Sequence, residues 1–376
     1  MSTVRVPRPR HALVSGKFYP PHSGHVHLAT TAAMFSEHVT VAVLGASHES
    51  LGIDERVAWL RESLERHPNV RVAGVVDDLP VDYGDPVAWD GHVALMRRAV
   101  ELADAQGPRP KVDAVFSSER YGLELGRRFD ALPVVLDPAR TTCPVSGTSV
   151  RSDIPGQWDD LPAATQAGLA VRVVVVGAES TGTTTLARDL AAALRTRGGA
   201  WQRCRWVGEH GRDRCAAMLA LAAAAGMPED LYWSEDDFLA IAAEQTRLEQ
   251  VAARNGGPVL VLDTDALATV VWHERYRGGA SSALDKLAAD LPRRDLYLLT
   301  LPEGVPFVQD GLRDGEHLRE SMTDRFRQIL TERVRSPWLE VRGSPQERVA
   351  AALERIDILC RHRWNFADPL PEANKP

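Results

Sequence analysis

Cysteine is scarce in this chain: four thiols occur in 376 residues, and they form no familiar pattern. Cys143, Cys204, Cys215 and Cys360 include no C-x-x-C pair, and their spacing matches no zinc site. A secreted domain stapled by disulfides is therefore excluded. Reduced thiols are typical of the cytosol, and we expect a cytoplasmic protein.

Long hydrophobic runs are also missing. No stretch reaches the roughly 18 apolar residues that a membrane-spanning helix needs, and the N-terminus lacks the apolar core of a signal peptide. We therefore expect no membrane insertion. Positive charge is not in excess either, because 44 basic residues face 51 acidic ones and the net charge is -7. This balance argues against a general nucleic-acid-binding protein, whereas a nucleotide needs only a few local cations.

The chain is rich instead in short β-branched runs that alternate with helical patterns. In the first half, the runs stand at residues 12–15, 39–44, 70–76, 113–117 and 134–137, with helical spacing at 25–35, 55–66 and 87–106. After a connection with Pro and Gly at 152–168, the runs resume at 171–176, 205–207, 259–262, 296–300 and 338–341, before an amphipathic helix at 347–361. This βαβ repetition predicts parallel sheets covered by helices.

We therefore predict an α/β protein of two domains, at residues 1–165 and 166–376, each with its own parallel sheet. Two phosphate-binding signatures distinguish them. The first predicts a Rossmann-like nucleotidyltransferase domain, and the second predicts a P-loop kinase domain. Each signature directly follows a predicted strand, and ligands of such sheets bind at the carboxyl ends of the strands.

The first signature has the pattern G-x-F-x-P-x-H-x-G-H, formed by Gly16, Phe18, Pro20, His22, Gly24 and His25. Gly16 permits a tight turn after the strand, and Gly24 permits close approach of a triphosphate where the next helix begins. The free N–H groups at that helix start attract phosphate. We expect His22 and His25 to donate to the phosphate under attack, because such transfers depend mainly on positioning and charge stabilisation.

A second segment supports a nucleotidyltransferase site. Residues 145–151 have the form of the I-S-x-T-x-x-R motif of the nucleotidyltransferase superfamily. We expect Ser146 and Thr148 to donate to phosphate oxygens at a helix start, and Arg151 to clamp the β- and γ-phosphates with its planar guanidinium. Lys17 is a further candidate for a phosphate contact, and a simple surface charge is the alternative.

The second signature, at 177–184, lies between a strand and a predicted helix at 183–197, which is the context of a P-loop. The residues expected to contact nucleotide are Gly177, Glu179, Ser180, Thr181, Gly182, Thr183, Thr184 and Thr185. Thr184 occupies the usual Mg²⁺ position. Asp263, at the end of a strand, is the expected Walker-B-like carboxylate, with Asp265 as the alternative.

Charged residues elsewhere in the second half complete the expected kinase site. Glu209 follows the strand at 205–207, where a carboxylate would accept the proton of a sugar hydroxyl, and Arg212 would contact a substrate phosphate. Arg313, in a lid-like segment at 310–313, would close over the transferred phosphate. A solvated cluster of charges is the alternative interpretation of this group.

One substitution conflicts with an active kinase, because Thr183 stands where a P-loop lysine would contact the β- and γ-phosphates. Removal of such a group typically costs several kcal/mol of transition-state stabilisation. Three interpretations remain: Arg313, or less favourably Arg188, replaces the lysine, or the domain binds nucleotide without catalysis, or it phosphorylates slowly. Because the rest of the expected site is retained, we favour an active kinase.

Taken together, these motifs resemble those of the NadR-type bifunctional nicotinamide-nucleotide adenylyltransferases and ribosylnicotinamide kinases. The resemblance covers nearly the whole chain and is most specific at 16–25, 145–151, 208–213, 262–265 and 310–313. It implies that the first domain joins nicotinamide mononucleotide to the AMP of ATP, giving NAD and pyrophosphate, and that the second phosphorylates nicotinamide riboside with ATP, each step with Mg²⁺. It also implies that Trp89 stacks on the cationic nicotinamide ring, with a core tryptophan as the alternative.

Some members of that family carry an N-terminal helix-turn-helix repressor domain. Here the first motif begins at Gly16, so we expect neither that domain nor binding to operator DNA. Three other functions fit parts of the pattern: an adenylyltransferase with an inactive, nucleotide-sensing second domain, a regulatory protein that senses NAD or ATP and signals to a partner such as a riboside transporter, and an adenylyltransferase for a metabolite such as phosphopantetheine. The sequence leaves the oligomeric state open, a homo-oligomer included.

Overall fold

The computed structural model describes residues 8–105, 107–226, 232–309 and 315–375. They form two compact units, each around its own five-stranded sheet. The first unit contains residues up to Gly168 and also the segment from Trp364 onward, and the second is Leu169–Arg363. Within the described residues, no helix is both long and apolar enough to cross a membrane.

The sheet of the first unit has the strand order β3-β2-β1-β5-β6, with parallel pairing throughout. The strands of this unit are β1 (His11–Gly16), β2 (His38–Gly45), β3 (Val70–Val76), β4 (Val81–Asp82), β5 (Ala114–Ser117), β6 (Leu132–Val135) and β12 (Glu372–Ala373). Its helices are α1 (Ser23–Phe35), α2 (Ile53–Ser63), α3 (Pro86–Asp104), α4 (Gly122–Phe129), α5 (Gly147–Ser152), the 3-10 turn η1 (Trp158–Asp160) and α6 (Ala163–Leu169).

Both faces of this sheet are buried, which explains its continuous apolar strands. Successive side chains of β1 alternate between the faces: Val14 packs in a core with α1 and α2, and Leu13 packs in a core with α3 and α4. Helix α3 begins where the Asp85 carboxylate accepts a hydrogen bond from the Val87 N–H at 2.8 Å, with Pro86 as its first residue.

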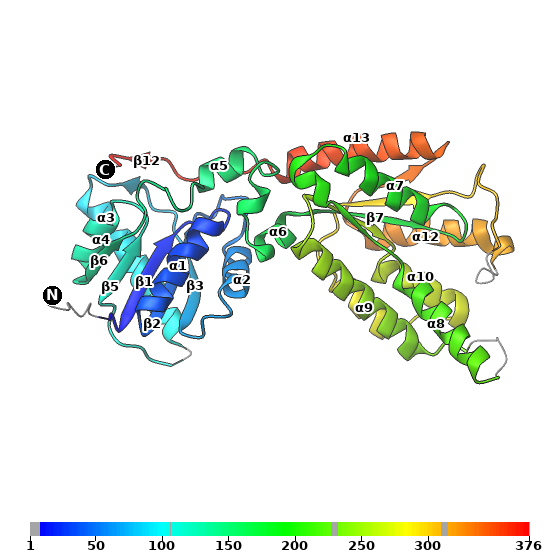
Figure 1. Ribbon diagram of the computed structural model, residues 1–376, viewed down its shortest axis with the longest axis horizontal. Helices are drawn as coiled ribbons and strands as arrows, with labels where there is room; N and C mark the ends of the chain where they lie inside the picture. The colour runs from blue at the N-terminus through cyan, green and yellow to red at the C-terminus, as the bar shows by residue number, and fades with distance from the viewer. Residues whose placement is uncertain (1–7, 106, 227–231, 310–314, 376) are drawn as a thin grey trace, which may run out of the picture. The chain divides into compact units, whose positions relative to one another are not determined.

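The second unit repeats this architecture with the strand order β11-β10-β7-β9-β8, again parallel. Its strands are β7 (Val171–Gly177), β8 (Arg205–Val207), β9 (Val259–Asp263), β10 (Leu296–Thr300) and β11 (Trp338–Val341). Its helices are α7 (Thr183–Arg195), η2 (Gly199–Arg203), α8 (His210–Ala224), α9 (Glu235–Arg254), α10 (Ala266–Arg277), α11 (Ser282–Ala289), η3 (Glu316–Leu318), α12 (Arg319–Arg333) and α13 (Pro345–Arg363). Helices α7 and α13 pack together on one side of β7, and α9, α10 and α12 lie on the other side (Figure 1).

The central strand of each sheet carries a phosphate-binding signature at its carboxyl end. Strand β1 lies between β2 and β5, and β7 lies between β10 and β9. In each sheet the strand order reverses at that point, which leaves a crevice for a ligand. The predicted α/β class and the predicted parallel sheets are therefore confirmed.

The structure differs from two predictions, one about the last strand of the first sheet and one about the domain limits. The run predicted as a strand at 134–137 is strand β6 at Leu132–Val135, because Asp137 has a φ of 45° and its carboxylate accepts hydrogen bonds from the loop N–H groups of Thr141 and Thr142. Residues 364–375, which we assigned to the second domain, pack with the first unit. Strand β12 within them pairs with β4.

Candidate nucleotide-binding sites

The first candidate site is a pocket at the carboxyl end of β1. It is lined by the loop 16–25, by the start of α5, by the segment 81–96 and by residues of the segment 364–375. The signature residues Gly16, Phe18, His22, Gly24 and His25 all line it. A Cβ on Gly24 would come within 3.2 Å of the His22 ring, so the close packing of this loop favours glycine there.

The two histidines form a stacked pair. Their ring centroids lie 3.6 Å apart at an interplanar angle of 26°, and His25 Nδ1 accepts a hydrogen bond from the His22 N–H at 3.3 Å. Burial, then the charge of Arg140, lowers the pKa of His22 to about 4. Burial, then His22 and Arg140, lowers the pKa of His25 well below its ordinary value. Both imidazoles are therefore neutral near pH 7 and act as hydrogen-bonding groups rather than cations.

This protonation state gives a direct prediction. In protein with ¹³C-labelled histidine, the ring signal of His22 is expected to stay at its neutral position from pH 8 to 5.5 and to move only as the pH approaches about 4. NMR titration measures this, and the signal is assigned by its loss in His22→Asn. An exposed histidine titrates near pH 6.5, and a His22 midpoint there would contradict the buried, neutral state.

The second motif of this site lies at the start of α5. Ser146 caps that helix, with its Oγ accepting from the Ser149 N–H at 3.0 Å, and Ser146 and Thr148 both line the pocket. Arg151 also lines it and donates to the Tyr19 carbonyl at 2.7 Å, while its guanidinium lies 5.2 Å from the Tyr19 ring centroid. The structure thus brings Arg151 onto the loop that carries the two histidines.

Lys17 and Trp89 line the pocket as well, and both have protein partners. Lys17 Nζ lies 3.3 Å from a carboxylate oxygen of Glu372. The Trp89 indole is 7% exposed, donates to the Tyr83 carbonyl at 3.1 Å and stacks edge-on with the Tyr83 ring at 5.8 Å. Trp89 is therefore both a core residue and part of the pocket wall. Tyr83 and Tyr121, which the sequence analysis did not select, extend this aromatic wall.

The second candidate site is a pocket above the P-loop, at the carboxyl end of β7. The loop turns sharply at Gly182, which has a φ of 90°. A Cβ on Gly177 would lie 2.2 Å from the Thr300 hydroxyl, so only glycine fits there. Residues Gly177, Glu179, Ser180, Thr183 and Thr184 line the pocket.

Several P-loop side chains hold the loop in place. The Thr181 hydroxyl is buried and donates to the Ala178 carbonyl at 2.7 Å. The Glu179 carboxylate pairs with Arg275 at 3.0 Å. Neither Thr181 nor Gly182 nor Thr185 is among the residues that line the pocket. The loop is thus braced by its own side chains, which leaves its backbone to face a ligand.

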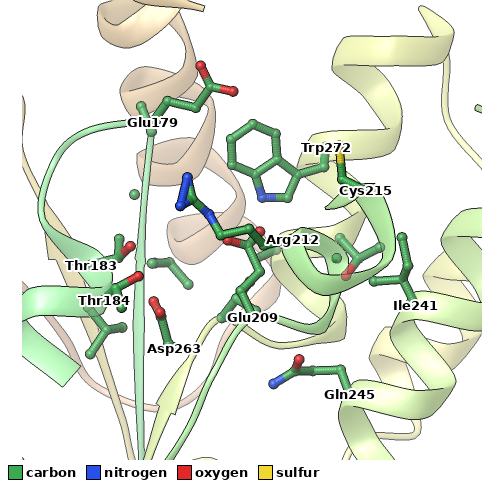
Figure 2. A pocket seen from close by; sticks show the side chains of 18 of the residues that line it. Glu179, Thr183, Thr184, Glu209, Arg212, Cys215, Ile241, Gln245, Asp263 and Trp272 are labelled. Carbon is green, nitrogen blue, oxygen red and sulfur yellow. The ribbon is translucent and has the colours of Figure 1, made fainter. Parts of the chain in front are cut away.

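Four side chains from three elements, α7, α8 and β9, converge at the mouth of the P-loop. Asp263, the last residue of β9, is 2% exposed, and burial raises the pKa of its carboxyl, while hydrogen bonds from the Thr184 and Thr183 hydroxyls and the charge of Arg212 oppose that rise. Figure 2 shows the Arg212 guanidinium, from α8, directed toward the P-loop between Glu179 and Thr183. A carboxylate beside a threonine hydroxyl fits Mg²⁺, which binds through few protein ligands and keeps waters and phosphate oxygens.

The structure separates the alternatives that the sequence left open around this site. Asp265 caps α10, because its Oδ1 accepts from the N–H groups of Leu267 and Ala268 at 3.0 and 3.1 Å, and it does not line the pocket. Arg188 does not line the pocket either, and its exposed guanidinium pairs with Asp189 at 3.3 Å. Arg313 lies outside the described residues.

Glu209 lines the pocket near an aromatic wall that the sequence analysis missed. The wall includes Trp233, Trp272 and Tyr276, and the rings of Trp233 and Tyr276 lie 6.4 Å apart. Figure 2 places Trp272 beside Arg212 and above Glu209. Trp272 and Tyr276 stand four residues apart on α10, a spacing that places both side chains on one helix face. This spacing is the one sequence signal from which part of the wall could have been predicted.

Comparison with known proteins finds one family that matches part of the chain and relatives that match a quarter to most of it. Residues 172–348 match the family described as AAA domain. The trifunctional NAD biosynthesis/regulator protein NadR of Escherichia coli strain K12 is 26% identical over 318 residues, which cover 80% of this chain and 71% of the relative. The phosphopantetheine adenylyltransferase of Cutibacterium acnes is 36% identical over 88 residues, which cover 23% of this chain and 55% of the relative.

Two solved structures of NadR proteins, one in complex with NR and one with NAD and AMP-PNP, have the same fold. Each is 20% identical to this chain, the TM-scores are 0.65 and 0.62, and the matches cover 95% and 96% of this chain and 98% of each neighbour. The sequence match to the E. coli protein covers 80% of the chain, more than either unit contains, so it extends over both units. Over both units the chain is therefore similar to NadR proteins, the family that its motifs resemble.

Proposed function

We propose that the chain is a bifunctional enzyme of NAD biosynthesis. The second domain phosphorylates nicotinamide riboside with ATP, and the first transfers the adenylyl group of ATP to the mononucleotide that results. One observation carries this proposal: two phosphate-binding loops each follow the central strand of their own parallel sheet, and each lies beside an aromatic wall. The relative named as a NAD biosynthesis protein, and the NadR structures with NR and with NAD and AMP-PNP, support it.

In the adenylyl transfer, a phosphate oxygen of the mononucleotide attacks the α-phosphorus of ATP. The new P–O bond completes NAD, the bond from the α-phosphorus to the bridging oxygen breaks, and pyrophosphate leaves. The substrate phosphate is itself the nucleophile, so no covalent enzyme intermediate is needed. The site has to position and neutralise phosphates, and His22, His25, Arg151 and the N-terminus of α1 are the groups that do so.

In the riboside kinase step, a ribose hydroxyl attacks the γ-phosphorus of ATP, the bond to ADP breaks, and the hydroxyl proton passes to Glu209. The nicotinamide ring is a cation, and the wall of Trp233, Trp272 and Tyr276 offers it aromatic faces. Thr184 and Asp263 would hold Mg²⁺, which would neutralise phosphate charge when bound.

Arg212 supplies the positive charge that Thr183 lacks. Its guanidinium is directed toward the P-loop at Thr183, and its charge acts on Asp263 at the same mouth of the pocket (Figure 2). A guanidinium binds phosphate oxygens as a planar fork, so an arginine from the facing helix α8 takes over the contact of a P-loop lysine. Of the two arginines proposed from the sequence, Arg188 lies away from the pocket.

A second candidate function is an adenylyltransferase whose P-loop domain senses nucleotide without catalysis. Thr183 is the observation that favours it. An adenylyltransferase for phosphopantetheine fits the match to a protein of that name but leaves the kinase-like second domain and the aromatic wall of Tyr83 and Trp89 without a role.

One reaction mixture separates these functions. Purified protein is incubated with nicotinamide riboside, ATP and Mg²⁺, and the products are separated by chromatography. We expect the mononucleotide to appear first and NAD to follow. If neither forms, a second mixture with added mononucleotide decides between the alternatives: NAD there means that the second domain is no riboside kinase, and its absence rules out the adenylyltransferase as well.

A further inference from the structure

The segment 364–375 belongs to the first site although it follows the second domain in the chain. Its residues Asp368, Pro369, Leu370, Pro371, Glu372 and Lys375 line the pocket at the end of β1. Strand β12 pairs in parallel with β4, with Glu372 opposite Val81 and Ala373 opposite Asp82. The Asn374 side chain donates to the Asp82 carboxylate at 2.8 Å and fixes this register.

Through this pairing the segment holds the aromatic wall of the pocket. The Ala373 carbonyl accepts from the Tyr83 N–H at 3.0 Å, and the Tyr83 carbonyl in turn accepts from the Trp89 indole N–H at 3.1 Å. The Tyr83 ring lies 5.8 Å from Trp89 and 6.1 Å from Tyr121. One main-chain hydrogen bond from the segment therefore fixes Tyr83, and the Tyr83 carbonyl orients the Trp89 indole.

The segment also holds the phosphate-binding loop. The Ala367 carbonyl accepts from the buried Tyr19 hydroxyl at 3.0 Å, and the Ala367 N–H donates to Ser50 Oγ at 2.8 Å. Lys17 Nζ donates to the Leu370 carbonyl and to the Glu372 carboxylate, both at 3.3 Å. These contacts reach Lys17 and Tyr19, the two residues of the motif loop that flank Phe18.

A third set of contacts is ionic. Lys375 Nζ lies 2.9 Å from Glu119 and 2.9 Å from Glu372, and Glu119 also pairs with Arg140 at 3.1 Å. Lys17, Lys375 and Arg140 thus surround two carboxylates at the pocket lining. These ionic contacts tie Lys375, near the end of the segment, to Glu119 and Glu372 in the pocket lining.

We propose that residues 366–375 are a positioning element of the adenylyl-transfer site, which they serve by fixing Tyr83 on one side of the pocket and Lys17 and Tyr19 on the other. This inference rests on the function proposed for the first domain. The segment acts through these residues and takes no direct part in the chemistry. It makes the first site depend on chain that is synthesised after the second domain.

The test removes the segment and then returns it as a separate molecule. A chain that ends at residue 363 is expected to lose adenylyl transfer from ATP to nicotinamide mononucleotide at least ~10²-fold, since misplaced binding groups have effects of this size. Riboside phosphorylation should stay within about twofold of the full chain. A synthetic peptide of residues 364–376 should restore adenylyl transfer in a saturable manner, and a peptide of the same composition in scrambled order should not.

Each of the other possible results would contradict either this proposal or the proposed function. Full adenylyl transfer by the shortened chain would overturn the proposal. Loss that the peptide cannot restore would mean that the segment serves only the folding of the domain, and the proposal would be wrong. If the full chain itself makes no NAD from the mononucleotide, the proposed function fails first, and that result is seen before any truncation.

A point variant of the full chain gives a second measurement. Lys375→Ala removes the link to Glu119 and Glu372, and we expect the KM for the mononucleotide to rise about tenfold, equivalent to ~1.4 kcal/mol, with kcat within about threefold. Lys111→Ala is the matched control, because Lys111 pairs with Asp130 on the exposed surface of the same unit, away from the pocket. Equal KM values in the two variants would contradict a positioning role.

Discussion

Replacement of His25 by alanine is expected to lower NAD synthesis from ATP and the mononucleotide at least ~10²-fold and to leave riboside phosphorylation unchanged. His25 lines the first pocket, stacks on His22 and accepts a hydrogen bond from the His22 N–H. In the proposed reaction, alanine removes a neutral donor to the attacked phosphate, and it also removes the ring on which His22 stacks. The second domain has its own phosphate-binding loop, so its activity serves as the internal control.

Two further variants separate the roles of the His25 ring nitrogens. Asparagine reproduces the acceptor near the position of Nδ1 and keeps the link to His22, whereas glutamine reproduces a donor near Nε2. If His25 donates to phosphate, His25→Gln retains more activity than His25→Asn. The reverse order would limit His25 to holding His22, and near-normal NAD synthesis in His25→Ala would sink the assignment. His67→Ala is the control, since His67 lies on the same unit outside the pocket.

The second large effect is expected at Arg212. Arg212→Ala should lower kcat for riboside phosphorylation at least ~10²-fold, because the charge on the transferred phosphate then loses its cation. Adenylyl transfer should be unaffected. Arg188→Ala is the matched control, an exposed arginine of the same unit that pairs with Asp189 away from the pocket, and it should stay within about twofold. Initial rates of mononucleotide formation compare the two variants with the unaltered chain, and NAD formation from added mononucleotide measures adenylyl transfer.

A rescue distinguishes a substitute for the P-loop lysine from a contact to the riboside. If Arg212 replaces the lysine, Thr183→Lys in the Arg212→Ala background restores much of the lost rate, since it returns a cation to the phosphates from the loop itself. A riboside contact would raise KM for the riboside, and Thr183→Lys would not help. Wild-type rates in Arg212→Ala would refute both roles and return attention to Arg313.

The sequence predicts the framework of both units because phosphate binding constrains it locally. A loop that cradles phosphate needs glycine where a side chain would collide, as at Gly177 and Gly24, and it needs a strand before it and a helix after it. Local periodicity supplies these elements. The central strands β1 and β7 and the helices after their loops, α1 and α7, therefore agree closely with the prediction.

The parts that the sequence could not predict depend on distant partners. Asp263 and Asp265 stand two residues apart and look equivalent in the sequence, but the strand ends between them. Asp265 turns into a buried cluster, where Arg294 and the Tyr297 hydroxyl contact it. A two-residue strand such as β12 has no periodicity to detect, and its partner β4 lies in the first half of the chain.

The division of the first unit into two stretches of chain has a consequence for synthesis. A ribosome builds the protein from its N-terminus, so residues 364–375 emerge only after the whole second unit has been made. A nascent or prematurely terminated chain that contains the motif at Gly16–His25 still lacks the strand that pairs with β4. If the segment acts as we propose, adenylyl transfer takes place only on chains that already contain the second unit. The two sites are then present in equal number in the cell, without any shared regulation.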